Sequence, residues 1–284
     1  MLDPDWMMTR PLLWLALAAL AVFLVVRAVR KDRREYRRFK MYRTTAKRQA
    51  MLRKWLWESF ATFGGLSVLL LLLAGFAVAP LLQELTTWPG VRELRGLVAN
   101  NPGIVVGAVI GGVIGLTLLT LVGVRAARAE QHVPVVGDVG AMLPRNRQEL
   151  RLGALLSVNA GVVEETLFRL AIPAAIYGAS GSAVAAVVAS VVLFGALHAY
   201  QGPVGIIAST IVGALMMLLY AVSGSILWPI VIHVLFDLRS LVLIPVAVYR
   251  VHRVDGVTTP VTKPLGQGVP TPKPAPAPAP DPSE

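Results

Sequence analysis

Long apolar segments recur along the chain, and they constrain its fold more than any other feature. Seven such segments are each long enough, or nearly so, to cross a bilayer as a helix of about 20 residues. Of the 284 residues, 55% are hydrophobic and 15% are charged, which is far more apolar than a soluble domain of this length. We therefore expect an all-α, polytopic transmembrane bundle with about seven spans, at residues 11–29, 60–82, 103–124, 153–178, 182–200, 204–221 and 226–249.

The positive charge of the chain is concentrated in one segment. Residues 27–54 hold thirteen lysines and arginines against two acids, so their net charge of +11 equals the formal charge of the whole chain. A basic run between two spans marks the cytoplasmic side of a membrane. We expect a cytoplasmic loop at 27–54, with the N-terminus outside and the C-terminus in the cytoplasm. Anionic membrane lipids are the expected partner of this charge, and nucleic acid is not.

The first apolar segment has the features of a retained anchor. Asp3 and Asp5 precede it, Arg27 follows it, and no clear small-x-small cleavage site ends it. The protein is therefore expected to be a multi-pass protein of the plasma membrane. The chain contains no cysteine, which excludes disulfides, thiolate metal sites and a cysteine nucleophile. Histidine and carboxylate side chains must carry any chemistry.

Three regions differ in character. Residues 1–150 supply three spans and are expected to be structural. Residues 151–249 supply four spans with the intramembrane acids and histidines, and form the candidate catalytic core. Residues 250–284 are rich in proline and alanine and are expected to be a disordered cytoplasmic tail. In the third span, glycine recurs at every fourth residue, which predicts a face for close helix packing, at Gly103, Gly107, Gly111 and Gly115.

A pair of glutamates interrupts the fourth apolar segment. Ionisable groups are costly at bilayer depth, so they indicate a functional site by default. Glu165 and Arg169 are four residues apart, share a helix face and are predicted to pair. Glu164 projects about 100° away from them on a helix. It is left freer, which suits a general base.

Two later segments each add a histidine. Phe194 precedes His198 by four residues, so its ring can pack on the imidazole. His233 precedes Asp237 by four residues, so the carboxylate can orient that imidazole. Each residue alone also has a structural explanation, as a buried helix clamp or as a hydrogen bond between helices. Their joint occurrence on three of the last four spans favours a functional site.

Helix geometry places these groups at different depths. Glu164 and His233 are expected at a similar level, whereas His198 is expected nearer the cytoplasmic face. A tilt or kink of the fourth span, for which Pro173 is one candidate cause, would bring them level.

The order and spacing of these residues resemble the CPBP family of intramembrane proteases, which includes the type II CAAX prenyl endopeptidases and the bacterial abortive-infection proteins. The resemblance covers about 100 residues, from the fourth span to the seventh. Its three motifs are Glu-Glu-x-x-x-Arg, Phe-x-x-x-His and His-x-x-x-Asn/Asp, present here as Glu164, Glu165 and Arg169, then Phe194 and His198, then His233 and Asp237.

The resemblance implies an intramembrane endopeptidase that hydrolyses a peptide bond of a membrane-associated protein or peptide. It implies that Glu164 activates water and that His198 helps to hold this water. His233 and Asp237 would stabilise the tetrahedral oxyanion or orient the group that does. Many relatives have asparagine at the last position. Because an ionised aspartate cannot donate a hydrogen bond, Asp237 would be protonated or would act through His233.

The sequence leaves a metal and two other functions open. Glu164, His198 and His233 could form a three-ligand site for a divalent metal such as zinc. A His-Glu-x-x-His helix is missing, so a glutamate-dependent mechanism without a cofactor is favoured. The alternatives are a transporter or proton-relay protein, and a catalytically silent membrane scaffold. The oligomeric state and the substrate stay open, and a prenylated substrate is not assumed.

Overall fold

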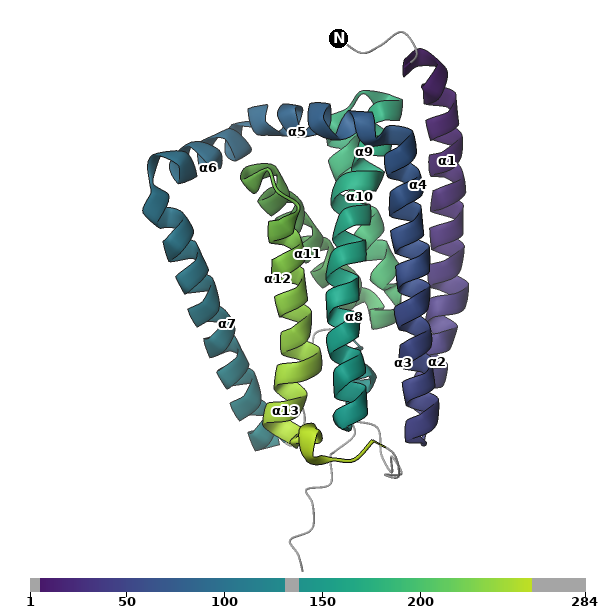
Figure 1. The fold of residues 1–284 in the computed structure, drawn as a ribbon, viewed down its shortest axis with the longest axis vertical. Coiled ribbons are helices and arrows are strands. Elements are labelled where there is room, and N and C mark those ends of the chain that lie inside the picture. The colour runs from purple at the N-terminus through teal and green to yellow at the C-terminus, as the bar shows by residue number, and fades with distance from the viewer. Residues whose placement is uncertain (1–5, 131–137, 257–284) are drawn as a thin grey trace, which may run out of the picture.

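The computed structural model describes residues 6–130 and 138–256, and in these ranges every regular element is helical (Figure 1). The predicted all-α class is therefore confirmed. With η denoting a π or 3-10 segment, the elements are α1 (Trp6–Val26), η1 (Arg27–Asp32), α2 (Arg33–Met41), α3 (Thr45–Ser59), η2 (Phe60–Gly64), α4 (Gly65–Ala74), η3 (Gly75–Ala77), α5 (Val78–Thr87), α6 (Pro89–Asn100), α7 (Pro102–Glu130), η4 (Gly140–Met142), α8 (Arg147–Glu165), η5 (Thr166–Ala171), α9 (Ile172–Ser180), α10 (Ala183–Leu197), η6 (His198–Gln201), α11 (Gly202–Ser223), α12 (Leu227–Leu238), η7 (Arg239–Leu243), α13 (Ile244–Tyr249) and η8 (Val251–Arg253).

Five helical stretches in the described part are long and apolar enough to cross a membrane, at Arg10–Met41, Thr45–Thr87, Gly103–Ala126, Ala183–Ser223 and Leu227–Tyr249. The expected count of seven is not confirmed. The predicted spans 182–200 and 204–221 are joined in the single stretch Ala183–Ser223, apart from residue 182. The predicted span 153–178 is helical but carries three charged residues. The start of α1 and α13 lie at opposite ends of the bundle (Figure 1). The predicted orientation of the termini stays a prediction.

The basic segment 27–54 is helical rather than a loop. Helix α1 continues through η1 into α2, and α3 begins again at Thr45 after a short turn. Arginine, lysine, glutamate and leucine are good helix formers, which explains this continuity. Glu35 joins the two helices, because its carboxylate accepts hydrogen bonds from Lys54 Nζ at 2.6 Å and from Trp55 Nε1 at 2.9 Å.

The second predicted span, 60–82, does not run straight. The crossing helix begins at Thr45 and ends at Ala74, after which α5 and α6 lie across one end of the bundle (Figure 1). Helix α7 then returns at the edge of the bundle. Its glycine stripe is not covered, because a Cβ added at any of the four glycines would meet no atom within 4 Å. The prediction that this stripe packs closely against a neighbouring helix is thus wrong for the described part of the chain.

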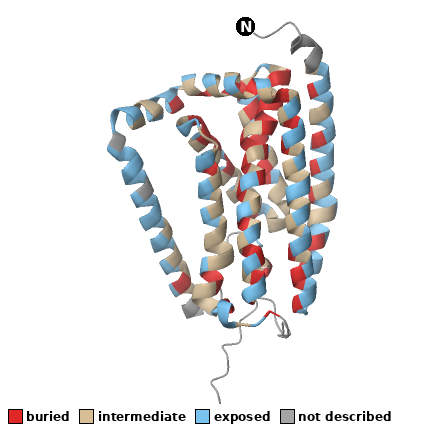
Figure 2. Ribbon diagram, viewed as in Figure 1, coloured by how far each residue is buried: buried red, intermediate tan, exposed pale blue. Residues whose placement is uncertain are grey.

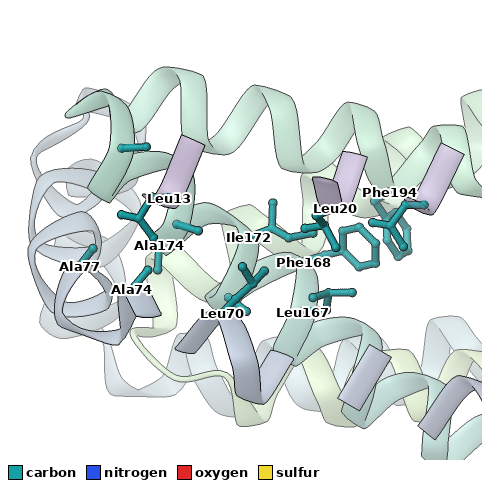
Figure 3. Packing of buried hydrophobic residues seen from close by; sticks show 14 residues of the cluster. Leu13, Leu20, Leu70, Ala74, Ala77, Leu167, Phe168, Ile172, Ala174 and Phe194 are labelled. Atoms are coloured by element: carbon teal, nitrogen blue, oxygen red, sulfur yellow. The ribbon is translucent and has the colours of Figure 1, made fainter. Parts of the chain in front are cut away.

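The largest apolar core lies between α1, α4 and the η5–α9 segment. Figure 2 shows the buried residues gathered around η5 and α9, with exposed residues along α7. Figure 3 shows Phe168 and Phe194 side by side at one end of this core, where their ring centroids are 5.2 Å apart. The outward faces of the helices carry many exposed leucines, valines and isoleucines, as expected of helices that contact lipid. The core therefore ends at the candidate site.

The predicted disordered tail, 250–284, lies outside the described residues from 257 onward.

Candidate active site

One face of α8 brings it close to α12. Gly153, Ser157, Gly161 and Glu165 are buried at intervals of four residues, so they follow one another along a single face. A Cβ added at Gly161 would lie 2.5 Å from Cγ2 of Val234 and 3.2 Å from the carbonyl oxygen of Ile230. Small residues thus seat α12 directly on α8, and the last residue on this face is a glutamate.

Glu165 joins α8, η5 and α12 through its carboxylate. Its Oε1 accepts a hydrogen bond from His233 Nδ1 at 2.7 Å and one from Arg169 Nη2 at 3.3 Å. Its Oε2 forms an ion pair with Arg169 Nε at 3.0 Å. The side chains of Glu165 and Arg169 are fully buried, and that of His233 is 15% exposed. The predicted Glu165–Arg169 pair is therefore present, and it also includes His233.

A π-helical turn follows the glutamate pair, over Thr166–Ala171. In a π pattern, the residue that would donate to the carbonyl of Phe168 is Pro173, which has no N–H group. Ser190 on α10 donates instead, with its Oγ 2.5 Å from this carbonyl oxygen. Pro173, the candidate cause of a kink, thus lies just after the π turn. The hydrogen bond from Ser190 attaches this turn to α10.

Glu164 differs sharply from its neighbour. Its side chain is partly buried and has no hydrogen-bond or ion-pair partner among the residues that the structure describes. Glu164 is therefore an unengaged carboxylate beside a fully engaged one.

Phe194 brings His198 to the same site. Its ring lies 4.8 Å from the His198 ring and 6.5 Å from the His233 ring, and the Arg169 guanidinium lies 4.7 Å over it. The predicted packing of Phe194 on His198 is confirmed. His198 Nδ1 lies 2.8 Å from the backbone oxygen of Phe194, which can only accept. The proton is thus assigned to Nδ1, and Nε2 of the neutral ring is free to accept a hydrogen bond.

Asp237 contacts His233 only loosely. Its Oδ2 lies 3.8 Å from His233 Nε2, too far for a hydrogen bond. The imidazole is instead held by Glu165, which lies on another helix. We expected Asp237 to orient the His233 ring, but Glu165 orients it instead. The reason is that α8 and α12 lie close enough to bring Glu165 within hydrogen-bonding distance of His233.

A metal site is not assembled in this structure. Within the described ranges, no three His, Asp or Glu side chains come close enough to hold one ion. The proposed ligand set of Glu164, His198 and His233 therefore does not fit a metal in this arrangement. The expected mechanism without a metal cofactor stays a prediction.

Two features of the site's surroundings were not anticipated. Tyr200 stacks on His198, with centroids 6.1 Å apart and planes inclined by 29°. A fully buried ion pair joins α3 to α8, with Arg48 Nη2 3.0 Å from Glu149 Oε2. Glu149 stands three residues after the helix-capping Asn146, a spacing typical of a helix start, and this is the only sequence signal that marks it.

Comparison with known proteins identifies one family. Residues 146–239 match the model described as type II CAAX prenyl endopeptidase Rce1-like, which is about a third of the chain. The match encloses all six predicted site residues and confirms the resemblance to the CPBP family of intramembrane proteases. Together with the five apolar helices of the described part, the match supports an integral membrane protein. No significant match was found to a curated protein or to a solved structure.

Proposed function

Since residues 146–239 match the type II CAAX prenyl endopeptidases, we propose that this protein is an intramembrane endopeptidase that uses Glu164 as its general base. The family match carries the class of reaction. The difference between the two adjacent glutamates supports the choice of base, because Glu165 is engaged by two partners and Glu164 by none among the described residues. A base must be free to accept a proton, and of the two adjacent glutamates Glu164 meets this condition.

Water attack is the first step of the proposed mechanism. Glu164 takes a proton from a water molecule while the oxygen of this water attacks the carbonyl carbon of the scissile bond. His198 accepts a hydrogen bond from the same water at Nε2, since its Nδ1 proton is already donated to Phe194. The water is thereby oriented by two acceptors, which places its oxygen lone pair toward the substrate.

The tetrahedral intermediate carries a negative oxygen that must be stabilised. In its doubly protonated form, His233 can donate from Nε2 to this oxyanion while Nδ1 remains bonded to Glu165. Asp237, 3.8 Å from Nε2, acts through the charge of His233 rather than on the substrate. Collapse of the intermediate breaks the C–N bond, and Glu164 returns its proton to the leaving amine. The products are a carboxylate and an amine.

The substrate class follows from the position of the site. Glu164, Glu165 and Arg169 lie within a helical segment of an integral membrane protein, so the scissile bond belongs to a protein or peptide held at the membrane. A peptide precursor, a C-terminal sorting tail and a membrane anchor each meet this requirement. We propose the plasma membrane as the location, with anionic lipids contacting the basic segment 27–54.

Purified full-length protein in detergent, incubated with candidate membrane peptides, tests the proposal. Glu164→Gln should abolish cleavage and leave the fold intact, as judged by circular dichroism and thermal unfolding. The matched control is Glu93→Gln, which makes the same change at an exposed glutamate of α6. Cleavage by Glu164→Gln at the wild-type rate would exclude Glu164 as the base. Ion flux through reconstituted protein, without cleavage of any peptide, would favour a transporter instead.

The metal requirement needs a separate measurement. The wild-type protein is assayed before and after a chelator, and its metal content is measured by mass spectrometry. Unchanged cleavage by metal-free protein is expected from a glutamate-dependent mechanism. Loss of cleavage that is restored by zinc would establish a metal at the site.

A further inference from the structure

We propose that Tyr200 is a positioning residue for His198, and that helix α2 of the basic segment holds it in place. This inference rests on the proposed function. No motif that identified the site includes Tyr200, and the region 1–150, to which α2 belongs, was expected to be structural only. The juxtaposition of Tyr200, His198 and Tyr36 indicates otherwise.

Tyr200 covers one side of the His198 ring. The two residues are two apart in η6, and their rings stack with centroids 6.1 Å apart. Phe194 covers the ring from another position, with centroids 4.8 Å apart. Such aromatic pairs favour a narrow range of orientations. The imidazole is therefore confined by two rings and by the hydrogen bond from its Nδ1 to the Phe194 carbonyl.

Tyr200 is itself held by a residue of α2 and by its own neighbour in η6. Its ring meets that of Tyr36, from α2, edge-on at 5.4 Å. Its hydroxyl oxygen accepts a hydrogen bond from Gln201 Nε2 at 2.9 Å. Tyr36 is only 3% exposed, so it forms a fixed surface rather than a mobile one. Tyr200 thus has little freedom to rotate away from His198.

Further contacts connect Tyr36 back to Tyr200. Lys40 lies 4.9 Å over the Tyr36 ring and pairs with Asp138. The backbone N–H of Asp138 donates to the carbonyl of Gln201 at 2.9 Å. Gln201 returns to Tyr200 through its side chain. These contacts join α2, the segment before α8 and η6, and Tyr200 connects them to His198.

Tyr200 lies in direct ring contact with His198, one of the predicted site residues. The ring is therefore part of the site's surroundings and not a distant packing residue. The expected consequence is that removing the ring misplaces His198 Nε2, and with it the attacking water, without removing any group that binds the substrate.

Kinetic measurements separate this role from a general loss of stability. Tyr200→Leu should lower kcat by roughly tenfold to a hundredfold and leave KM nearly unchanged, since misplacing a catalytic group acts on the chemical step. Tyr200→Phe keeps the ring and should recover most of kcat. The matched control is Tyr220→Leu, the same change at a buried tyrosine of α11 that packs against Val191 and Met217. An equal fall of kcat in the control, or full kcat in Tyr200→Leu, would overturn the proposal.

A second readout does not depend on proteolysis. Diethyl pyrocarbonate acylates accessible imidazole nitrogens, and mass spectrometry measures the rate at His198. Tyr200→Leu should raise this rate severalfold, whereas Tyr200→Phe and Tyr220→Leu should leave it near the wild-type rate. An unchanged rate in Tyr200→Leu overturns the positioning role, whether or not the protein cleaves peptides. Cleavage that survives Glu164→Gln contradicts the proposed function but leaves the labelling contrast intact.

Discussion

His233 Nδ1 lies 2.7 Å from Oε1 of Glu165, a contact that joins two helices across 68 residues of sequence. This contact and the Arg169 ion pair make Glu165 the anchor of the site, whereas its neighbour Glu164 stays unengaged. The two glutamates should therefore respond differently to the same substitution.

Glu165→Gln should lower both stability and activity, whereas Glu164→Gln should lower activity alone. Removing the charge of Glu165 leaves Arg169 buried without a counter-charge, which costs about 3–5 kcal/mol when one partner of a buried pair is lost. Thermal unfolding in detergent and peptide cleavage, measured on both variants, test this asymmetry. Equal loss of stability in the two variants would contradict it.

Asp237→Asn should retain more activity than His233→Ala. Asp237 lies 3.8 Å from His233 Nε2 and acts through it, so an amide of the same shape preserves most of the site. Removal of His233 takes away the donor to the oxyanion, an effect of roughly 10²–10³-fold in kcat. Steady-state kinetics on one peptide substrate compare the two. If Asp237→Asn is the more damaging change, the aspartate itself takes part in the reaction.

Gly161→Ala should separate α8 from α12. A Cβ at this position would lie 2.5 Å from Val234 and 3.2 Å from the Ile230 carbonyl, and overpacking of this kind costs about 1–3 kcal/mol. The contact between Glu165 and His233 should weaken as the helices move apart. Gly111→Ala is the matched control, because its Cβ would meet nothing within 4 Å.

The two glycine variants are compared by thermal unfolding and by cleavage rate. Gly111→Ala should be neutral or stabilising by up to about 1 kcal/mol, since alanine favours a helix over glycine. A Gly161→Ala protein with wild-type unfolding and cleavage would show that the helices need no close approach.

The buried Arg48–Glu149 pair should contribute stability without taking part in the reaction. Arg48 Nη1 also donates to the carbonyl of Ala141 at 3.1 Å, and its Nη2 donates to that of Leu143 at 3.3 Å. Arg145 nearby is half-buried, and the partial burial of its guanidinium together with the charge of Arg48 lowers the pKa of Arg145 to about 10. Glu149 is thus the buried counter-charge of Arg48, and its Oε2 also accepts a hydrogen bond from the backbone N–H of Arg145 at 3.1 Å.

Glu149→Gln should therefore destabilise the protein by about 3–5 kcal/mol. The double variant Arg48→Met/Glu149→Leu should recover much of this loss, because no unpaired charge of the pair remains. Unfolding of the single and double variants measures the effect. A double variant no more stable than Glu149→Gln would show that the backbone hydrogen bonds of Arg48 matter more than its charge.

Much of the site could be predicted because its chemistry is local. Glu165 and Arg169 pair at helical spacing, and Phe194 packs on His198 at the same spacing, as expected from positions four apart on one helix face. The contact between Glu165 and His233 could not be predicted in this way. It depends on how closely α8 and α12 approach, which is set by small residues on a face whose partner helix the sequence does not specify.

The topology was harder to predict for a different reason. Apolarity marks segments suited to a membrane but does not show where a helix bends. The prediction of a second span at 60–82 did not include the change of direction after Ala74. Glycine and alanine continue the apolar run at this point, so the sequence shows no break. The basic segment 27–54 was expected to be a loop from its charge, yet charge alone does not oppose a helix. Tyr36 of this segment contacts Tyr200 beside the site, although the region 1–150 was expected to be structural only.

The π turn over Thr166–Ala171 has a consequence for any comparison of this helix with an ideal one. A single π turn is equivalent to one extra residue in an α-helix, so the periodicity after the turn is out of phase with the periodicity before it. A helical wheel drawn through both parts would assign lipid-facing positions wrongly on one side. A scan of polar substitutions along α8 and α9 should therefore give two separate patterns of tolerance, offset by about one residue, with the change of phase directly after Glu165.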